Sequence, residues 1–405
     1  MRILVHDSGH AFPVQLSRYL ARRGHEVLHL YAASMAMPRG PVAPRPDDPP
    51  SFAIRGLSLG RPIEKYSYIR RVFDERAYGR LLAREIERMR PDVMLGGTSA
   101  VDIQAAAVAA CRRLGIGFVF WAQDLNAIAI DRLLRRRLPI VGALAGRYYL
   151  GLEQRLLRAS DAVVAISDDF LPVLAGWGVP RERVAVIENW APLDELPPHP
   201  RDNAWAREHG LADKLVFLYS GTLGLKHNPD LLLQLARRFA PRPEIRVAVV
   251  SEGLGADWLR QRQADAPNLV LLPYQPFARL PEVIATGDVL VAILEPDAGA
   301  FSVPSKVLTY LCAGRPILGA VPSENLAART IRRAGAGMTV PPDDMAGFLA
   351  AAERLAGDAE TRGRYGNNAL DYANKTFDIR AIGARFEAIL EAAAHRHPKQ
   401  GTARP

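Results

Sequence analysis

The sequence predicts an α/β protein made of two doubly wound, parallel-sheet (Rossmann-like) domains. Three observations support this prediction: a length of 405 residues, a regular alternation of short apolar runs with helical patterns, and a Pro-rich polar segment near the middle of the chain. A chain of this length exceeds one hydrophobic core of ordinary size. Alternating strands and helices are typical of parallel sheets covered by helices.

In the first half, five apolar runs have the length and composition of buried strands. They are residues 2–7, 25–31, 92–97, 118–124 and 161–167. Apolar residues recur at helical spacing in two of the segments between them, at 15–24 and 105–115. Predicted strands and helices therefore alternate along this half of the chain, as they do in a doubly wound sheet.

The segment PLDELPPHPRD (192–202) is polar and Pro-rich, and after it the alternation restarts. New strands are expected at 215–221, 246–253, 269–274, 289–294 and 316–321, with helices at 230–239 and 304–314. A linker of this kind marks a domain boundary. We expect one domain over 1–195 and a second over 196–376.

The stretch FSVPSKVLTYLCAGRP (301–316) combines a small polar cluster with an apolar helix that stops at Gly314. A helix start carries free backbone N–H groups, and here it also carries the Ser305 hydroxyl and the Lys306 ammonium, which together would form an anion site. The alternative is that Ser305 only caps the helix and Lys306 is solvated.

Composition narrows the class of protein. Hydrophobic residues make up 49% of the chain, no apolar run is long enough to cross a bilayer, and MRILVHDSGH is unlike a signal peptide, so we expect a cytoplasmic protein. Cys111 and Cys312 are the only cysteines and lie far apart in the sequence, so neither a disulfide framework nor a zinc cluster is implied.

The formal charge is +9, and residues 132–158 hold seven arginines against one glutamate, interleaved with Leu, Ile, Val and Tyr. A basic amphipathic stretch of this kind can lie on the anionic inner leaflet of a membrane. The alternative is an ordinary surface helix whose arginine stems cover apolar area.

Ligands of open parallel sheets bind beyond the carboxyl ends of the strands. After the first strand, Gly9 allows close backbone approach to a ligand, or forms a plain tight turn. After the strand at 118–124, Gln123 and Asp124 could hydrogen-bond a sugar, or Asp124 could cap a helix.

In the second half, YSGTLGLKHN (219–228) follows the first strand. Its small residues Ser220, Gly221 and Gly224 would let main-chain N–H groups face a ligand, and Lys226 adds a charge suited to phosphate. The spacing is not that of a Walker loop.

Two further loops that follow predicted strands contain candidate ligand-binding residues. Tyr274 and Gln275 could hold a flat heterocycle by packing and hydrogen bonds, or the loop could be structural only. Glu295 and Asp297 immediately precede the polar cluster that opens the 301–316 stretch.

Five motifs occur in order along the chain: RGHEV (23–27), VVAISDDF (163–170), VIENWAP (186–192), SGTLGLKHN (220–228) and VPSKVLTYLCAGRPIL (303–318). Together they resemble a retaining glycosyltransferase of the two-Rossmann-domain (GT-B) type, family 4-like. The resemblance is to the bacterial group that builds exopolysaccharides and lipid-linked oligosaccharides.

The resemblance implies a nucleotide-sugar donor on the second domain, a saccharide or polyprenyl-linked saccharide acceptor on the first, and chemistry in the cleft between them. A final helix at about 377–395 would pack back onto the first domain, leaving 396–405 as a tail. The donor diphosphate would lie on Ser302, Val303, Ser305 and Lys306, with Lys226 opposite. No metal and no cofactor besides this co-substrate is then expected, since no Asp-x-Asp spacing occurs, and no nucleic acid partner is expected.

The chain departs from the family pattern in two places. Many relatives carry two glutamates that align here with Phe301 and Thr309, and an arginine that aligns with Thr222. Glu295 or Asp297 would then contact the sugar instead.

Three functions remain open at this point. The first is a hexosyltransferase, the second a nucleotide-sugar epimerase of the same architecture, and the third a non-catalytic subunit that binds nucleotide or a partner transferase. The small number of carboxylates near the expected diphosphate site disfavours an epimerase, which needs acid and base groups at the sugar ring.

Overall fold

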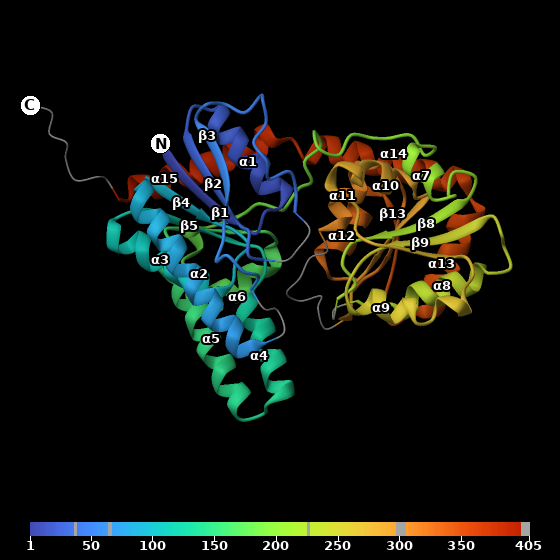
Figure 1. Cartoon of the computed structure of the whole chain (residues 1–405), viewed down its shortest axis with the longest axis horizontal. Coiled ribbons are helices and arrows are strands. Elements are labelled where there is room, and N and C mark those ends of the chain that lie inside the picture. The colour runs from blue at the N-terminus through green and yellow to red at the C-terminus, as the bar shows by residue number, and fades with distance from the viewer. Residues whose placement is uncertain (36–38, 64–66, 225–226, 297–304, 398–405) are drawn as a thin grey trace, which may run out of the picture. The chain divides into compact units, whose positions relative to one another are not determined.

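The computed structural model (Figure 1) describes residues 1–35, 39–63, 67–224, 227–296 and 305–397. They form two compact units, one of residues 1–189 together with the segment from 379 onwards, the other of residues 190–378. Each unit is built on a parallel sheet with helices packed around it. The predicted fold class is confirmed.

The first unit contains a seven-stranded sheet in the order β3-β2-β1-β4-β5-β6-β7, with parallel neighbours throughout. The strands are β1 (Arg2–Asp7), β2 (Glu26–Ala32), β3 (Phe52–Leu57), β4 (Val93–Gly96), β5 (Gly117–Ala122), β6 (Ala162–Ala165) and β7 (Val184–Val186). The central strands β4 and β5 are buried along their whole length, which explains why they are apolar runs without alternation.

The first unit's helices pack on this sheet or on one another. They are α1 (Ala11–Arg22), α2 (Tyr68–Met89), α3 (Val101–Leu114), α4 (Asn126–Arg137), α5 (Val141–Ala159), α6 (Leu171–Gly176) and α15 (Ile379–His395). The final helix belongs to this first unit, as predicted, and it packs on β5. Phe386 meets Trp121 with ring centroids 4.7 Å apart, and a Cβ on Gly117 would lie 2.7 Å from the Ala393 carbonyl oxygen.

The arginine-rich stretch 132–158 differs from the single surface helix considered above. It spans the second half of α4 and nearly all of α5, and these two helices pack against each other as a hairpin. Pro139 explains the break, because the residue before a proline is pushed out of the helical region, and Leu138 has φ −140° and ψ 85°.

The second unit contains a six-stranded parallel sheet in the order β10-β9-β8-β11-β12-β13. The strands are β8 (Leu215–Ser220), β9 (Ile245–Val250), β10 (Leu269–Leu272), β11 (Val289–Ile293), β12 (Ile317–Ala320) and β13 (Gly337–Val340). The helices are α7 (Ala204–Glu208), α8 (Asp230–Phe239), α9 (Leu254–Arg260), α10 (Leu280–Thr286), α11 (Lys306–Cys312), α12 (Leu326–Ala334), α13 (Met345–Gly357) and α14 (Ala359–Thr376).

This unit has its own core, in which Phe217, Leu232, Val249 and Phe348 are fully or almost fully buried. No helix within the described part of the chain is both long and apolar enough to span a membrane.

Candidate functional site

The carboxyl edge of the second sheet is organised around Lys306, the first residue of α11. Its Nζ is buried and lies 3.5 Å from the ring centroid of Tyr219, near the end of β8. Gly221 passes beside it with φ +133°, and a Cβ there would lie 3.3 Å from the ammonium. The alternative in which Lys306 is solvated is therefore wrong. The ammonium is held at the strand end, where ligands of such sheets bind.

Tyr310 ties α11 to the same strand end. Its hydroxyl accepts a hydrogen bond from the Ser220 N–H at 2.9 Å and donates to the Ser220 carbonyl oxygen at 3.2 Å. Tyr310 is one helical turn after Lys306, so this double contact also fixes the lysine relative to β8. Burial raises the pKa of the Tyr310 phenol, which keeps it neutral at physiological pH.

The sequence predicts that main-chain N–H groups of the loop after β8 face a ligand. In the structure, several of these groups are already hydrogen-bonded within the protein. The N–H of Gly221 donates to the Val250 carbonyl, that of Leu223 to the Ser251 hydroxyl, and that of Gly224 to His227 Nδ1. The small residues thus serve close packing within the loop. The Lys306 side chain places a positive charge at this strand end.

Thr222 and Tyr274 are brought together, and Gln275 is not. The Thr222 hydroxyl and the half-buried Tyr274 hydroxyl share a hydrogen bond of 2.5 Å. The Gln275 amide instead accepts from Trp205 Nε1 at 3.1 Å and donates to the Pro273 carbonyl. The side-chain oxygen of Gln275 therefore attaches the loop after β10 to α7, and its amide nitrogen bonds within the loop itself.

The remaining predicted residues of this unit lie in or next to α11, just after β11, or outside the described residues. Ser305 is exposed, and its side chain makes no capping bond, contrary to the capping alternative. Thr309 and Glu295 are partly buried. Four predicted site residues fall outside the described residues: Lys226, Asp297, Ser302 and Val303.

In the first unit, Gln123 and Asp124 follow β5, as predicted, and Gln123 has a definite partner. It exchanges two side-chain hydrogen bonds with Asn189, at 3.1 and 2.6 Å. Asn189 belongs to the VIENWAP motif. The pair joins the end of β5 to the segment that leaves the first unit.

Glu153 of α5 is a buried acid beside this strand end that sequence reasoning missed. It is 1% exposed, and its carboxylate accepts a hydrogen bond from the Ala127 N–H, at the start of α4, at 3.0 Å. Burial raises its pKa to about 7, and the negative charge of Asp124 adds to the shift. The available signal was one acid in the otherwise apolar run YYLGLE (148–153).

The turn after β1 is fixed by its own polar network. Asp7 accepts from the Gly9 N–H at 2.9 Å, from the His10 N–H at 3.0 Å and from His29 Nε2 at 3.0 Å. Gly9 has φ +97°, which supports the tight-turn alternative for this glycine. The side chains of His10 and His29 hold the pKa of the Asp7 carboxyl well below its ordinary value despite burial.

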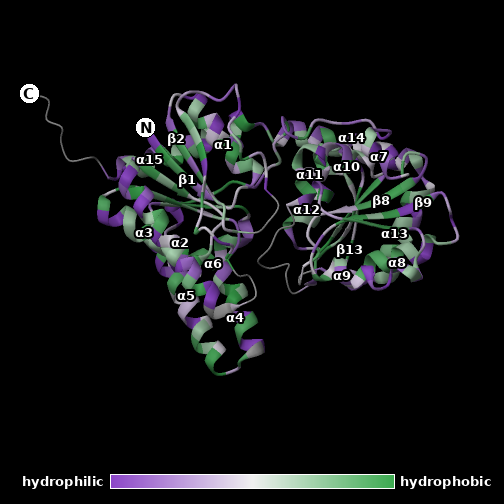
Figure 2. Ribbon diagram, viewed as in Figure 1, coloured by the Kyte–Doolittle hydropathy of each residue, from purple (hydrophilic) through white to green (hydrophobic). Residues whose placement is uncertain are grey.

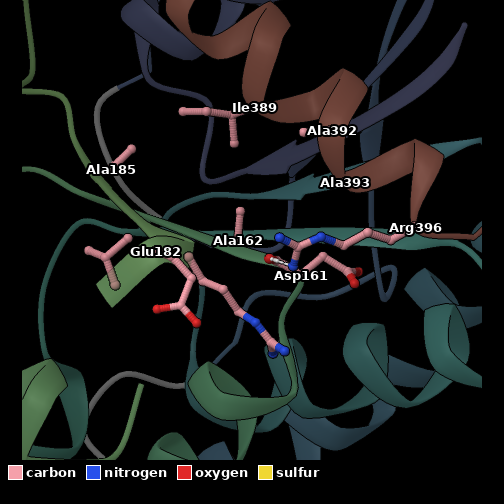
Figure 3. Close-up of a pocket in the computed structure, with 10 residues that line it drawn as sticks. Asp161, Ala162, Glu182, Ala185, Ile389, Ala392, Ala393 and Arg396 are labelled. Carbon is pink, nitrogen blue, oxygen red and sulfur yellow. Dashed lines mark hydrogen bonds between the residues drawn. The ribbon is translucent and has the colours of Figure 1, made fainter. Parts of the chain in front are cut away.

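A cavity of about 130 Å³ lies at the opposite, amino edge of the first sheet (Figure 3). Asp161 and Ala162 line it at the start of β6, and Ile389 and Arg396 line it from the end of the chain. Arg396 donates to the Asp161 carbonyl oxygen at 2.6 Å. This cavity is separate from the carboxyl-edge residues described above.

Two family models match the chain. The model of Glycosyltransferase Family 4 matches residues 12–195, and the model of Glycosyl transferases group 1 matches residues 214–358. Between them they take in most of both units.

One curated relative is WcaI of Escherichia coli K12, whose name assigns it to colanic acid biosynthesis as a glycosyl transferase. The two chains are 25% identical over 241 residues, which is 58% of this chain and 58% of the relative. The match thus spans little more than half of the relative's length.

Solved structures share the fold over nearly the whole chain. Sucrose-phosphate synthase from Thermosynechococcus elongatus superposes with a TM-score of 0.70 at 14% identity, covering 96% of this chain and 98% of that chain. HepE from Anabaena, solved in complex with UDP-glucose, gives a TM-score of 0.68 at 14% identity, covering 97% and 100%. At these identities the likeness shows the fold.

Proposed function

Because the chain belongs to the glycosyltransferases of GT-B fold, we propose that it moves a hexose from a nucleoside-diphosphate sugar to a saccharide acceptor, with retention of configuration. The acceptor we propose is carried on a polyprenyl lipid, and the pathway is the biosynthesis of a cell-surface polysaccharide. The name of the WcaI relative supports that pathway.

One observation carries the proposal: the buried Lys306 ammonium at the carboxyl end of β8, set between Tyr219 and Gly221. A departing nucleoside diphosphate gains negative charge as the glycosidic bond breaks. A cation fixed in advance stabilises that charge without reorganisation in the transition state. The proposed reaction therefore needs no metal ion, and Lys226 would supply a second positive charge.

A nucleotide-sugar donor also agrees with the ligand in the HepE structure, UDP-glucose. We assign Thr222, Tyr274, Ser305 and Thr309 to the walls of the donor site, because they lie on the loops and helix around Lys306. Glu295 and Asp297 are the proposed contacts to the donor sugar, and Gln123 and Asp124 those to the acceptor.

The test is a panel of UDP-, GDP- and ADP-hexoses incubated with the full chain, in which released nucleoside diphosphate is measured. Lipid-linked saccharides are then added, and the product is analysed by mass spectrometry and by NMR of the new anomeric centre. Transfer with retained configuration is the expected result. Conversion of the sugar without a new glycosidic bond would identify an epimerase, and binding without any release a non-catalytic subunit.

A further inference from the structure

The α4–α5 hairpin exposes an apolar tip, here defined as residues 138–144. Four large apolar side chains on it are strongly exposed: Leu138 by 55%, Ile140 by 79%, Val141 by 66% and Leu144 by 65%. Elsewhere among the described residues, large apolar side chains this exposed are scattered singly. Figure 2 shows the hydrophobic colouring gathered where α4 meets α5.

The tip cannot bury these side chains within the hairpin. Gly142 and Gly146 of α5 lie directly on α4: a Cβ on Gly142 would be 2.1 Å from the Leu134 carbonyl oxygen, and one on Gly146 would be 2.1 Å from Asp131 Oδ1. The space between the two helices is thus already filled by backbone. Leu138, Ile140, Val141 and Leu144 remain outside it.

The base of the hairpin is fixed to the first unit. Tyr149 donates a hydrogen bond to the Asp102 carboxylate of α3 at 2.8 Å. At the same end Glu153 of α5 accepts from the Ala127 N–H of α4 at 3.0 Å, which holds the two helices of the hairpin together. A hairpin anchored in this way presents its tip at a set position.

The charges around the tip have one sign. Arg132, Arg135, Arg136 and Arg147 are exposed, and Asp131 is the only acid in residues 126–152. Asp131 is itself paired with Arg135 at 2.8 Å, and its side chain is 15% exposed. The surface that surrounds the tip is therefore apolar and cationic.

Either a second copy of the chain or a membrane could cover this apolar tip. The apolar side chains and the arginines together favour the membrane. A second copy of the chain would bring two arginine clusters together, and like charges oppose that contact. An anionic bilayer satisfies both features, because lipid phosphates accept the arginines while the apolar side chains enter the acyl boundary.

We propose that the α4–α5 hairpin docks the protein on an anionic membrane surface, with residues 138–144 inserted at the headgroup boundary and the arginines on the lipid phosphates. The proposal deepens the function proposed above, since it names the surface on which a lipid-linked acceptor is met. The observations behind this proposal all come from the α4–α5 hairpin, and its test is the binding of the protein to lipid vesicles.

The experiment is sedimentation of the full chain with vesicles of phosphatidylcholine, with and without a third of phosphatidylglycerol. The parent is expected to sediment with anionic vesicles and to be released by added salt. The Arg136→Glu/Arg147→Glu variant should bind at least about thirty-fold more weakly, because each basic residue near such a surface contributes about a five-fold gain in partitioning. Ile140→Ser/Leu144→Ser should lose at least about ten-fold.

Two matched variants control for surface chemistry. Leu254→Ser removes an exposed apolar side chain of the second unit, and Lys375→Glu/Arg260→Glu reverses two exposed charges there. Both should bind anionic vesicles like the parent.

Three results would overturn the proposal. These are no sedimentation of the parent, equal sedimentation with neutral vesicles, or a dimer in light scattering that the Ile140→Ser/Leu144→Ser variant dissolves. Nucleotide release from the donor is followed in the same samples, so a protein that binds vesicles but releases no nucleotide would remove the transferase proposal and leave this one standing.

Discussion

At the scale of single residues, Lys306 is the sharpest test of the donor site. We expect Lys306→Met to weaken nucleoside-diphosphate binding ten-fold to about a hundred-fold, because a charge-assisted hydrogen bond contributes about 1.5–3 kcal/mol. Methionine keeps apolar volume against Tyr219 and Gly221, so the melting temperature should not fall. Calorimetric titration with UDP and GDP measures the first effect and thermal unfolding the second.

Lys375→Met is the matched control, because Lys375 is 71% exposed and pairs with Asp371 one turn away on α14. It should bind nucleotide like the parent. Equal binding by the Lys306 and Lys375 variants would place the diphosphate elsewhere.

Glu153 makes stability depend on pH. Its pKa is raised from 4.5 to about 7, so between these pH values the native state holds a proton that the unfolded state has released. Stability from this group is therefore lost as the pH rises from about 4.5 to 7, by about 3 kcal/mol in total. Glu153→Gln keeps an acceptor for the Ala127 N–H and removes the titration.

We expect the free energy of unfolding of Glu153→Gln, relative to the parent, to increase by about 3 kcal/mol between pH 5 and pH 8 in urea titrations. Glu353→Gln, a surface residue paired with Arg238, should run parallel to the parent. Parallel curves for both variants would mean that Glu153 titrates as an ordinary acid.

The positions of Lys306, Gly221, Thr222 and Tyr274 could be predicted from sequence, because each follows a recognisable strand or opens a helix at one sheet edge. Glu153 could not, because it reaches the end of β5 from a helix that begins about twenty residues later. The pairing of Gln275 with Trp205 also depends on tertiary packing, between α7 and the loop after β10.

At the scale of elements, the strands that sequence reasoning missed are edge strands. β3 and β7 close the two sides of the first sheet, and β13 closes one side of the second. β13 is only partly buried along its length, and β3 includes the partly exposed Arg55. An edge strand buries less surface, so its apolar signal is weak, whereas central strands such as β5 are apolar throughout.

The contact between α11 and β8 gives a prediction at this scale. Tyr310→Phe leaves the Ser220 N–H and carbonyl without their side-chain partner, and an unsatisfied buried group costs about 1–3 kcal/mol. We expect the second unit to unfold at lower urea and nucleotide binding to weaken, since the strand end and Lys306 are no longer held together.

Tyr372→Phe is the control for that change. Its hydroxyl accepts from Arg333 at the surface of α14, at 2.6 Å, and its removal should change stability by less than about 1 kcal/mol. If Tyr310→Phe matched Tyr372→Phe in both assays, α11 would be positioned by packing alone.

At the scale of the whole molecule, the second unit should function as an isolated fragment. Residues 190–378 have their own sheet and core and contain Gly221, Tyr274 and Lys306. We expect this fragment to fold cooperatively and to bind nucleoside diphosphate, more weakly than the full chain. Circular dichroism and calorimetric titration test both points, and nucleotide binding confined to the first unit would contradict the donor assignment.

The fragment of residues 1–189 is the counterpart, and it should fold poorly. It lacks α15, and the surface of β5 around Trp121 and Gly117 would then be open to water. Adding a peptide of residues 379–397 should restore its thermal transition.

Because the first unit depends on α15, it cannot be completed on the ribosome until that helix has been translated. The first unit begins at the N-terminus, but its last helix is translated only after residues 190–378. At about 5–20 residues per second, that interval lasts roughly 10–40 s. During that interval Trp121 has no Phe386 to cover it, so the nascent chain carries an uncovered apolar face that chaperones of the cell can bind until α15 has been made.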